Sequence, residues 1–249
     1  MSNPHMKFYP HLLGFLFLWL TACKTAYIPV SQHQEKYKIE SGIDSSSAIE
    51  RMLKPYRDSL SSRMNEVIGT ASDHFVKQKP SGSLGNLVSD AMLTAARKTD
   101  PACMGAVCNY GGIRIPQLSA GPVTVGRVFE MLPFDNELVL LKLPGSTLRQ
   151  WCKLMAKAEG WPIAGFSFNY RDSVALSIRF DGQPFDIQDT ATYTIVTNDY
   201  IANGGDQCSF LQPLSKIPLN ILVRDAMLND IRKRKTINPD LQERIHKIP

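Results

Sequence analysis

The stretch SLGNLVSDAMLTAARK, residues 83–98, carries a clear helical signal. Its apolar residues recur every three or four positions, so they share one face of a helix: Leu84, Leu87, Val88, Ala91, Met92 and Ala95. Such a face packs against a core, and Ser83 in front of it is a candidate N-cap. The stretch therefore predicts a buried helix at the centre of a folded domain.

The segments on either side of this helix predict an α+β fold. Further helices are expected from about residue 47, over 124–132 with Thr124 as N-cap, over 145–160 and over 219–235. Short apolar runs predict strands at 105–108, 136–143, 165–170, 174–180 and 192–197, and Asp181-Gly182 is a turn signal. Helices and strands alternate irregularly, which favours a mixed sheet with flanking helices over a doubly wound sheet.

The first residues have the features of an export signal. Lys7 precedes a short apolar run, and the run ends in Leu20-Thr21-Ala22-Cys23. Leu-x-Ala-Cys resembles a bacterial lipobox, so we expect a signal peptide over 1–22 and a lipid on Cys23. An ordinary signal peptide with a chance cysteine is the alternative. We expect a polar tether over 23–44, a domain over 45–249, and an exported protein that is anchored to a bacterial membrane, in the periplasm or at the cell surface.

Composition limits the classes of partner. The chain has 249 residues and a formal net charge of +5, an excess too small to indicate a nucleic-acid partner. Four cysteines follow Cys23, at positions 103, 108, 152 and 208. Their spacing is not that of a zinc site, and it leaves open whether they form disulfides or remain buried thiols.

Three polar, flexible turns follow apolar segments, and they hold the candidate binding residues. They are NYGGIR at 109–114, LPFDN at 132–136 and NDYIANGGDQC at 198–208. Glycine lets a backbone approach a ligand closely, and loops at the ends of strands are common binding positions. Each turn taken alone is more often an ordinary turn than a site.

Four motifs in this order resemble one family: LGNLVSDA, NYGGIR, MLPFDNELV and NDYIANGGD. The chain resembles the C-terminal, substrate-binding domain of 5'-nucleotidases and UDP-sugar hydrolases over about residues 45–212. In that family this domain binds the nucleoside, and a separate N-terminal domain holds two metal ions and performs the hydrolysis.

The resemblance implies a role for each candidate residue. Phe134 and Tyr200 would stack on the two faces of the base, and Asp206 would accept hydrogen bonds from the ribose hydroxyls. Asn109 would contact the base or the nearby turn, and Arg114 would bind phosphate. Without the resemblance, both aromatic residues would be read as packing residues, Asp206 as a turn acid and Arg114 as a surface charge.

The sequence departs from the family pattern at three places. Pro80 stands where the family usually has a second phosphate-binding arginine, and the adjacent Lys79 supplies only a point charge. Tyr110 replaces a glycine, which is expected to crowd the pocket. Gln207-Cys208 replaces a small residue followed by an aromatic one.

The sequence offers no metal site of its own. The histidines after the expected signal peptide are His33, His74 and His246, and none lies in a motif typical of a binuclear metal centre. We therefore expect no cofactor or catalytic residue in this chain, with divalent metals only in a partner. Three hypotheses stay open: half of a 5'-nucleotidase whose metallophosphoesterase is a separate chain, a non-catalytic module for nucleosides or aromatic ligands, and a structural lipoprotein with a decayed pocket.

Overall fold

The computed structural model describes residues 47–249, and residues 50–249 form one compact unit. The expected signal peptide, Cys23 and the tether lie outside the described residues. The fold is α+β with mixed sheets, as the sequence predicts.

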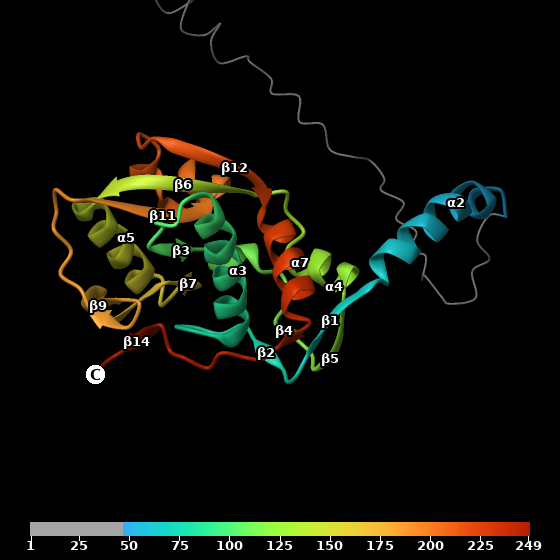
Figure 1. The fold of residues 1–249 in the computed structure, drawn as a ribbon, viewed down its shortest axis with the longest axis horizontal. Coiled ribbons are helices and arrows are strands. Elements are labelled where there is room, and N and C mark those ends of the chain that lie inside the picture. Colours follow the sequence, from blue (N-terminus) through green and yellow to red (C-terminus); the bar gives the residue numbers. More distant parts are fainter. Residues whose placement is uncertain (1–46) are drawn as a thin grey trace, which may run out of the picture. The chain divides into compact units, whose positions relative to one another are not determined.

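A five-stranded mixed sheet forms the centre of the unit (Figure 1). Its strand order is β12 (Lys216–Leu222), β6 (Glu137–Pro144), β11 (Thr192–Asn198), β3 (Gly105–Val107) and β7 (Ile163–Ala164). Strands β11 and β3 are parallel, and every other neighbouring pair is antiparallel. The sheet therefore brings strand ends from distant parts of the sequence to the same edge.

Side chains alternate between the two faces of this sheet, because successive residues of a strand point in opposite directions. On β6, Leu138 and Leu140 pack into the core formed with α3 (Ser83–Thr99), α4 (Val125–Met131) and α7 (Val223–Arg234). Val139 and Leu141 pack into the opposite core, with α5 (Gly145–Lys157) and the hairpin of β8 (Phe166–Arg171) and β9 (Val174–Phe180). Figure 1 shows α3 and α7 grouped together, apart from α5.

Smaller elements complete the unit. Strands β13 (Thr236–Ile237), β1 (Val67–Ala71) and β5 (Gly121–Thr124) form a three-stranded sheet, and β2 (Phe75–Val76) pairs with β4 (Gln117–Leu118). Strands β10 (Gln183–Pro184) and β14 (Ile245–Lys247) extend the β8–β9 hairpin on its two sides. A 3-10 turn lies between β3 and β4, at Tyr110–Gly112. Between β11 and β12 lie the helix α6 (Asp199–Ala202) and two further 3-10 turns, Gly205–Gln207 and Ser209–Leu211.

The helix α3 confirms the prediction from residues 83–98, and all six residues of its apolar stripe are buried. The prediction that Ser83 is its N-cap is wrong. The N-cap is Gly82, and the Ser83 hydroxyl accepts a 2.9 Å hydrogen bond from the backbone N–H of Val76. Thr124, by contrast, caps α4 as predicted, since its side chain accepts from Arg127 N.

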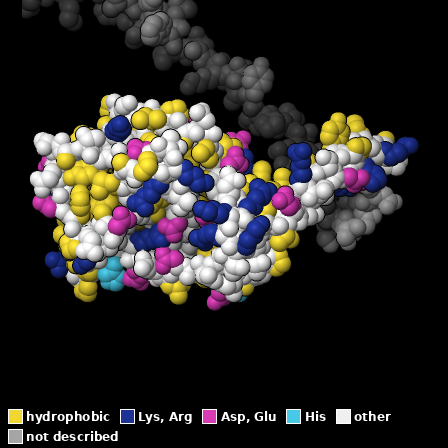
Figure 2. Space-filling model, in the orientation of Figure 1, with side chains coloured by type: hydrophobic (Ala, Val, Ile, Leu, Met, Phe, Trp, Pro, Cys, Tyr) yellow, Lys and Arg dark blue, Asp and Glu magenta, His cyan; other side chains and the backbone are white. Residues whose placement is uncertain are grey.

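The last helix is shorter than the sequence predicts. Residues 219–222 belong to β12, which pairs antiparallel with β6, and α7 begins only at Val223. Strand β12 pairs with the edge of β6 before residue 219 and again at Leu222, with a register shift between Pro218 and Leu222, and this long-range pairing outweighs the helical pattern. Lys and Arg side chains gather over α7 (Figure 2), and of its basic end Arg232 pairs with Glu66 and Arg234 with Asp230.

The first described helix, α2 (Ser47–Met64), is a single helix that continues through Pro55. None of its residues is buried, and its apolar side chains, among them Met52 and Tyr56, are exposed. Within residues 47–249 no helix combines the length and the apolar character needed to cross a bilayer.

The four cysteines of the described region resolve the alternative that the sequence leaves open. Cys103, Cys108, Cys152 and Cys208 are all buried free thiols. Burial raises the pKa of Cys108, Cys152 and Cys208 to about 12 in each case. These side chains therefore serve as small apolar core residues.

Candidate functional site

The three polar turns meet at one edge of the central sheet. Strands β3 and β11 are parallel, so the segments that follow them, beginning with Cys108 and Asp199, leave the sheet on the same side. Strand β6 runs the other way, and its first residues pair with the end of β11, with Leu138 opposite Asn198. The loop that precedes β6 and contains Phe134 therefore lies at this same edge.

A pocket of about 330 Å³ opens between these turns. Its lining includes all five binding residues suggested by the sequence, together with two glycines and one asparagine: Asn109, Gly111, Gly112, Arg114, Phe134, Asn136, Tyr200 and Asp206. The volume suits a small organic ligand, and the lining combines aromatic faces with a few polar groups.

The two aromatic residues are exposed at the rim of the pocket. Phe134 and Tyr200 are each 47% exposed, so the core accounts for only part of their surface. This observation goes against reading them as ordinary packing residues. The guanidinium carbon of Arg114 lies 5.8 Å from the centroid of the Phe134 ring, and its Nη1 donates to the carbonyl of Gly111.

A chain of hydrogen bonds orients the only carboxylate in the pocket lining. Asn198 Nδ2 donates to Asn109 Oδ1 at 3.0 Å, and Asn109 Nδ2 donates to Asp206 Oδ2 at 3.0 Å. The Tyr200 hydroxyl donates to Asp206 Oδ1, also at 3.0 Å. Asn109 and Asn198 are buried, so the carboxylate is fixed from the protein side while it faces the pocket.

The backbone at Asp206 is unusual for a residue with a side chain. Its φ and ψ are 48° and 45°, in the left-handed region that Asp and Asn enter more easily than most residues. Gly204, two residues earlier, has a φ of 96°. These left-handed residues turn the chain sharply, and the turn aims the Asp206 carboxylate back toward Tyr200.

A second acid, Asp199, connects the two loops that hold the aromatic rings. Its Oδ1 accepts from the backbone N–H of Tyr200 at 2.9 Å and from that of Glu137 at 3.1 Å. Glu137 begins β6, three residues after Phe134. The shared acceptor therefore ties the start of α6 to the end of the Phe134 loop.

A group of cations lies next to the pocket. Lys77 Nζ is 4.1 Å from the centroid of the Tyr110 ring and donates to the carbonyl of Ile113, the residue before Arg114. Burial, followed by the charge of Arg114, lowers the pKa of Lys77. Lys79, the residue that the sequence suggests as the substitute phosphate ligand, also lies by Tyr110, at 5.2 Å, but its Nζ donates to Ala158 O.

Sequence reasoning missed three residues of this site. Asn136 lines the pocket, and its signal was its place in the LPFDN turn, two residues after Phe134. Asn198 is the buried end of the hydrogen-bond chain, at the last position of β11. Lys77 had no sequence signal, because only the tertiary fold brings β2 and the loop after it against Tyr110.

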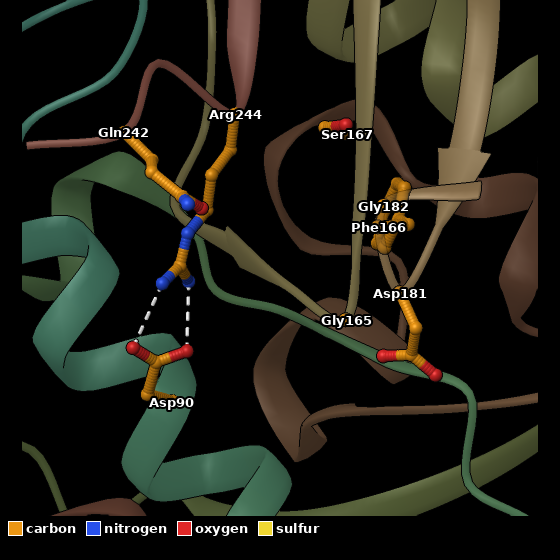
Figure 3. Close-up of a pocket in the computed structure, with 8 residues that line it drawn as sticks. All are labelled: Asp90, Gly165, Phe166, Ser167, Asp181, Gly182, Gln242 and Arg244. Atoms are coloured by element: carbon orange, nitrogen blue, oxygen red, sulfur yellow. Dashed lines mark hydrogen bonds and ion pairs between the residues drawn. The ribbon is translucent and has the colours of Figure 1, made fainter. Parts of the chain in front are cut away.

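Residues 47–249 bring together no group of three or more His, Cys, Asp or Glu side chains that could hold a metal ion. His74 and His246 are both exposed, and His246 Nδ1 contacts Glu243. A second hollow of about 340 Å³ lies between α3, the β8–β9 hairpin and the segment before β14. There Arg244 binds the carboxylate of Asp90 through two hydrogen bonds of 2.8 Å (Figure 3).

Comparison with known proteins relates the chain to 5'-nucleotidases. The sequence profile of the family described as 5'-nucleotidase, C-terminal domain matches residues 67–213. The endonuclease YhcR of Bacillus subtilis (strain 168) is 32% identical over an alignment of 177 residues, and the match covers 68% of this chain and 14% of that protein. A 5'-nucleotidase of Vibrio vulnificus (strain CMCP6) is 25% identical over an alignment of 189 residues, and the match covers 72% of this chain and 33% of the relative.

Among solved structures, a 5'-nucleotidase precursor from Thermus thermophilus matches with a TM-score of 0.70 and 25% identity. The match covers 80% of this chain and 43% of that one. The chain thus spans less than half the length of each of these relatives. Since the profile matches more than half of the chain and the fold agrees, the chain belongs to the 5'-nucleotidase C-terminal domain family.

Proposed function

We propose that this chain binds nucleosides and nucleotides in the Phe134–Tyr200 pocket. We further propose that it is the substrate-binding half of a 5'-nucleotidase whose metallophosphoesterase domain is a separate chain. The observation that supports this function most directly is the pair of half-exposed rings on the rim of a pocket that also holds the oriented Asp206 carboxylate. Aromatic faces and an acceptor for vicinal hydroxyls are what a base and a ribose require.

Each part of a nucleoside has a matching group. The base would stack on Phe134 and Tyr200, a contact worth about 1–3 kcal/mol per ring and tolerant of base identity. The amide of Asn136 would offer a donor and an acceptor to the edge of the base. Each oxygen of Asp206 already accepts one protein hydrogen bond and retains acceptor capacity for one ribose hydroxyl.

The phosphate of a nucleotide would lie toward Arg114 and Lys77. Within residues 47–249 no carboxylate forms an ion pair with either side chain, and the like charge of Arg114 helps to lower the pKa of Lys77. An anion between them would relieve this repulsion. Arg114 can present a forked pair of donors, whereas Lys77 and Lys79 offer point charges.

The hydrolytic chemistry would come from the partner. Divalent metals and the residues that bind them would belong to the metallophosphoesterase chain, and this chain would bind and orient the substrate. The match to the C-terminal domain of longer relatives supports the binding role of this chain. We propose export and lipid attachment at Cys23 on the basis of the lipobox alone.

Calorimetric titration of the full chain with adenosine and with AMP tests the binding function. Saturable binding is expected, with a clear loss of affinity in Phe134→Ala and in Tyr200→Ala. Weaker binding of AMP in Lys77→Gln, with unchanged binding of adenosine, would place the phosphate beside Lys77. Failure of the native chain to bind either compound would remove the proposed function and leave a purely structural role.

A reconstitution assay tests the division of labour. The chain is mixed with a separately expressed metallophosphoesterase chain and a divalent metal, and phosphate release from AMP is measured. Release is expected only when both chains are present. Nucleoside binding without any effect on hydrolysis would favour the alternative, a non-catalytic binding module, while metal-dependent release by this chain alone would contradict both.

A further inference from the structure

Arg224, in the first turn of α7, is a buried cation whose hydrogen bonds, within the described residues, all go to the loop that carries Phe134. The residue is only 7% exposed, although arginine is rarely buried without a specific partner. It belongs to none of the motifs that mark the nucleoside pocket, and it does not line that pocket. Its role must therefore be read from the groups that surround its guanidinium.

Those groups belong to the loop between α4 and β6. Arg224 Nη1 donates to the carbonyls of Leu132 and Phe134, at 3.3 and 3.5 Å, and Nη2 donates to the carboxylate of Asp135. One residue earlier, Val223 N donates to the carbonyl of Asn136 at 2.9 Å. The first two residues of α7 thus satisfy three carbonyls and one side chain of a five-residue loop.

The guanidinium is itself held from the side of α4. Its carbon lies 4.1 Å from the centroid of the Phe129 ring, a cation–π contact. Its Nε has no hydrogen-bond partner within the described part of the chain. The side chain therefore directs its Nη donors to the Phe134 loop and leaves one buried donor unsatisfied, an arrangement that costs stability.

We infer that Arg224 is a positioning residue, which fixes the Phe134 ring at the separation and tilt needed to stack on a base. Phe134 is half exposed, so packing of the ring itself does not define its position. Arg224 donates to the backbone carbonyl of Phe134 itself, the residue that carries the ring. This inference rests on the proposed function for its ligand, but the position of the ring can be measured without one.

Arg244 provides a matched control. Its side chain is 11% exposed, against 9% for Arg224, and it too is held by acids and a carbonyl: Asp90, Asp240 and Ile163 O. Figure 3 shows its fork on Asp90, a residue of α3. None of these partners lines the nucleoside pocket. Loss of either arginine removes a buried charge network, but only Arg224 touches the Phe134 loop.

The experiment compares Arg224→Met, Arg224→Lys and Arg244→Met with the native full chain. Calorimetry gives the Kd for adenosine, and hypochromism of bound adenosine reports stacking. Arg224→Met is expected to raise the Kd roughly tenfold, the scale of one lost stacking contact, and to reduce the hypochromism. Arg224→Lys should recover part of both, and Arg244→Met should lower the melting temperature while leaving both near native values.

A second measurement needs neither ligand nor full stability. A single para-fluorophenylalanine at position 134 gives a 19F resonance, which should shift or broaden in Arg224→Met and Arg224→Lys but not in Arg244→Met. Unchanged resonance and unchanged Kd in both Arg224 variants would overturn the inference. If the native chain binds no adenosine, the proposed function fails, and the 19F spectra alone decide whether Arg224 positions the ring.

Discussion

The side-chain amide of Asn109 donates a 3.0 Å hydrogen bond to Oδ2 of Asp206, a residue 97 positions further along the chain. The other oxygen of the same carboxylate accepts from the Tyr200 hydroxyl at 3.0 Å. The carboxylate is thus oriented before any ligand arrives, and each oxygen keeps one lone pair for a hydroxyl donor.

Replacing Asp206 with Asn is expected to weaken adenosine binding by roughly ten- to a hundredfold, since hydrogen bonds to a charged group contribute about 1.5–3 kcal/mol. Asn suits the test because it tolerates the left-handed backbone found there. The control ligand is 2',3'-dideoxyadenosine, whose affinity should change little. An equal loss for both ligands would show that Asp206 does not bind the ribose.

The two parts of Tyr200 can be separated by substitution. Tyr200→Ala removes the ring and should cost about 1–3 kcal/mol of adenosine binding. Tyr200→Phe keeps the ring and removes only the donor to Asp206, so its cost should stay below about 1.5 kcal/mol. Calorimetry on both variants measures the difference. Equal losses in the two variants would mean that the hydroxyl, and not the ring, accounts for the affinity.

The ionisation of Tyr200 should report the same contact. Its hydrogen bond to Asp206, followed by the negative charge of that residue, raises the pKa of Tyr200 above the ordinary value of 10.0. The folded state therefore favours the protonated phenol. The resulting stability is complete below the unfolded pKa and is lost as the pH rises through the folded pKa.

The measurement is an alkaline titration of tyrosinate absorbance, taken as the difference between the native chain and Tyr200→Phe. The difference signal should titrate above 10.0, and Asp206→Asn should move it down. A difference signal that titrates at or below the ordinary value would exclude the contact in solution.

Gly205 is required by the position of the Tyr200 ring. A Cβ added at Gly205 would lie 2.5 Å from two carbons of that ring, and the ring would have to move. Gly205→Ala should therefore weaken adenosine binding to about the same extent as Tyr200→Ala. The control is Gly182→Ala, where no atom lies within 4 Å but φ is +79°, so stability should fall and binding should not. Native-like affinity in Gly205→Ala would contradict the placement of the ring.

The thiols of the described region should resist modification. Burial, together with the charge of Asp206, raises the pKa of Cys108 and of Cys208 to about 12, so the reactive thiolate is scarce at neutral pH. A disulfide reagent is expected to label none of the four cysteines between residues 47 and 249 in the folded protein, and all four after denaturation. Rapid labelling of either residue in the folded state would show that the core around it opens.

Much of the fold could be predicted because its signals are local. Each of these signals depends on residues that lie close together in the sequence. They are the apolar stripe of α3, the apolar runs of β6 and β11, and the Asp181-Gly182 turn. The prediction was wrong where a helix and a strand compete for the same residues. Residues 219–222 have a helical pattern, yet they belong to β12, which pairs with β6 on both sides of a register shift between Pro218 and Leu222.

The residues of the candidate site also form two groups, those that the sequence indicated and those that it did not. The three turns and the order of the motifs indicated Asn109, Arg114, Phe134, Tyr200 and Asp206 as candidate binding residues, and all five line the pocket. The sequence contained no indication of Arg224 or Lys77, because each acts through a contact with a segment far away in the chain.

That the three turns form one pocket follows from the tertiary structure alone. That outcome follows from strand direction: β3 and β11 are parallel and β6 is antiparallel to β11, so two strand ends and one strand start meet at a single edge. Chemical character is a property of individual residues and can be read from sequence. Proximity is set by long-range pairing of strands, whose partners no local pattern specifies.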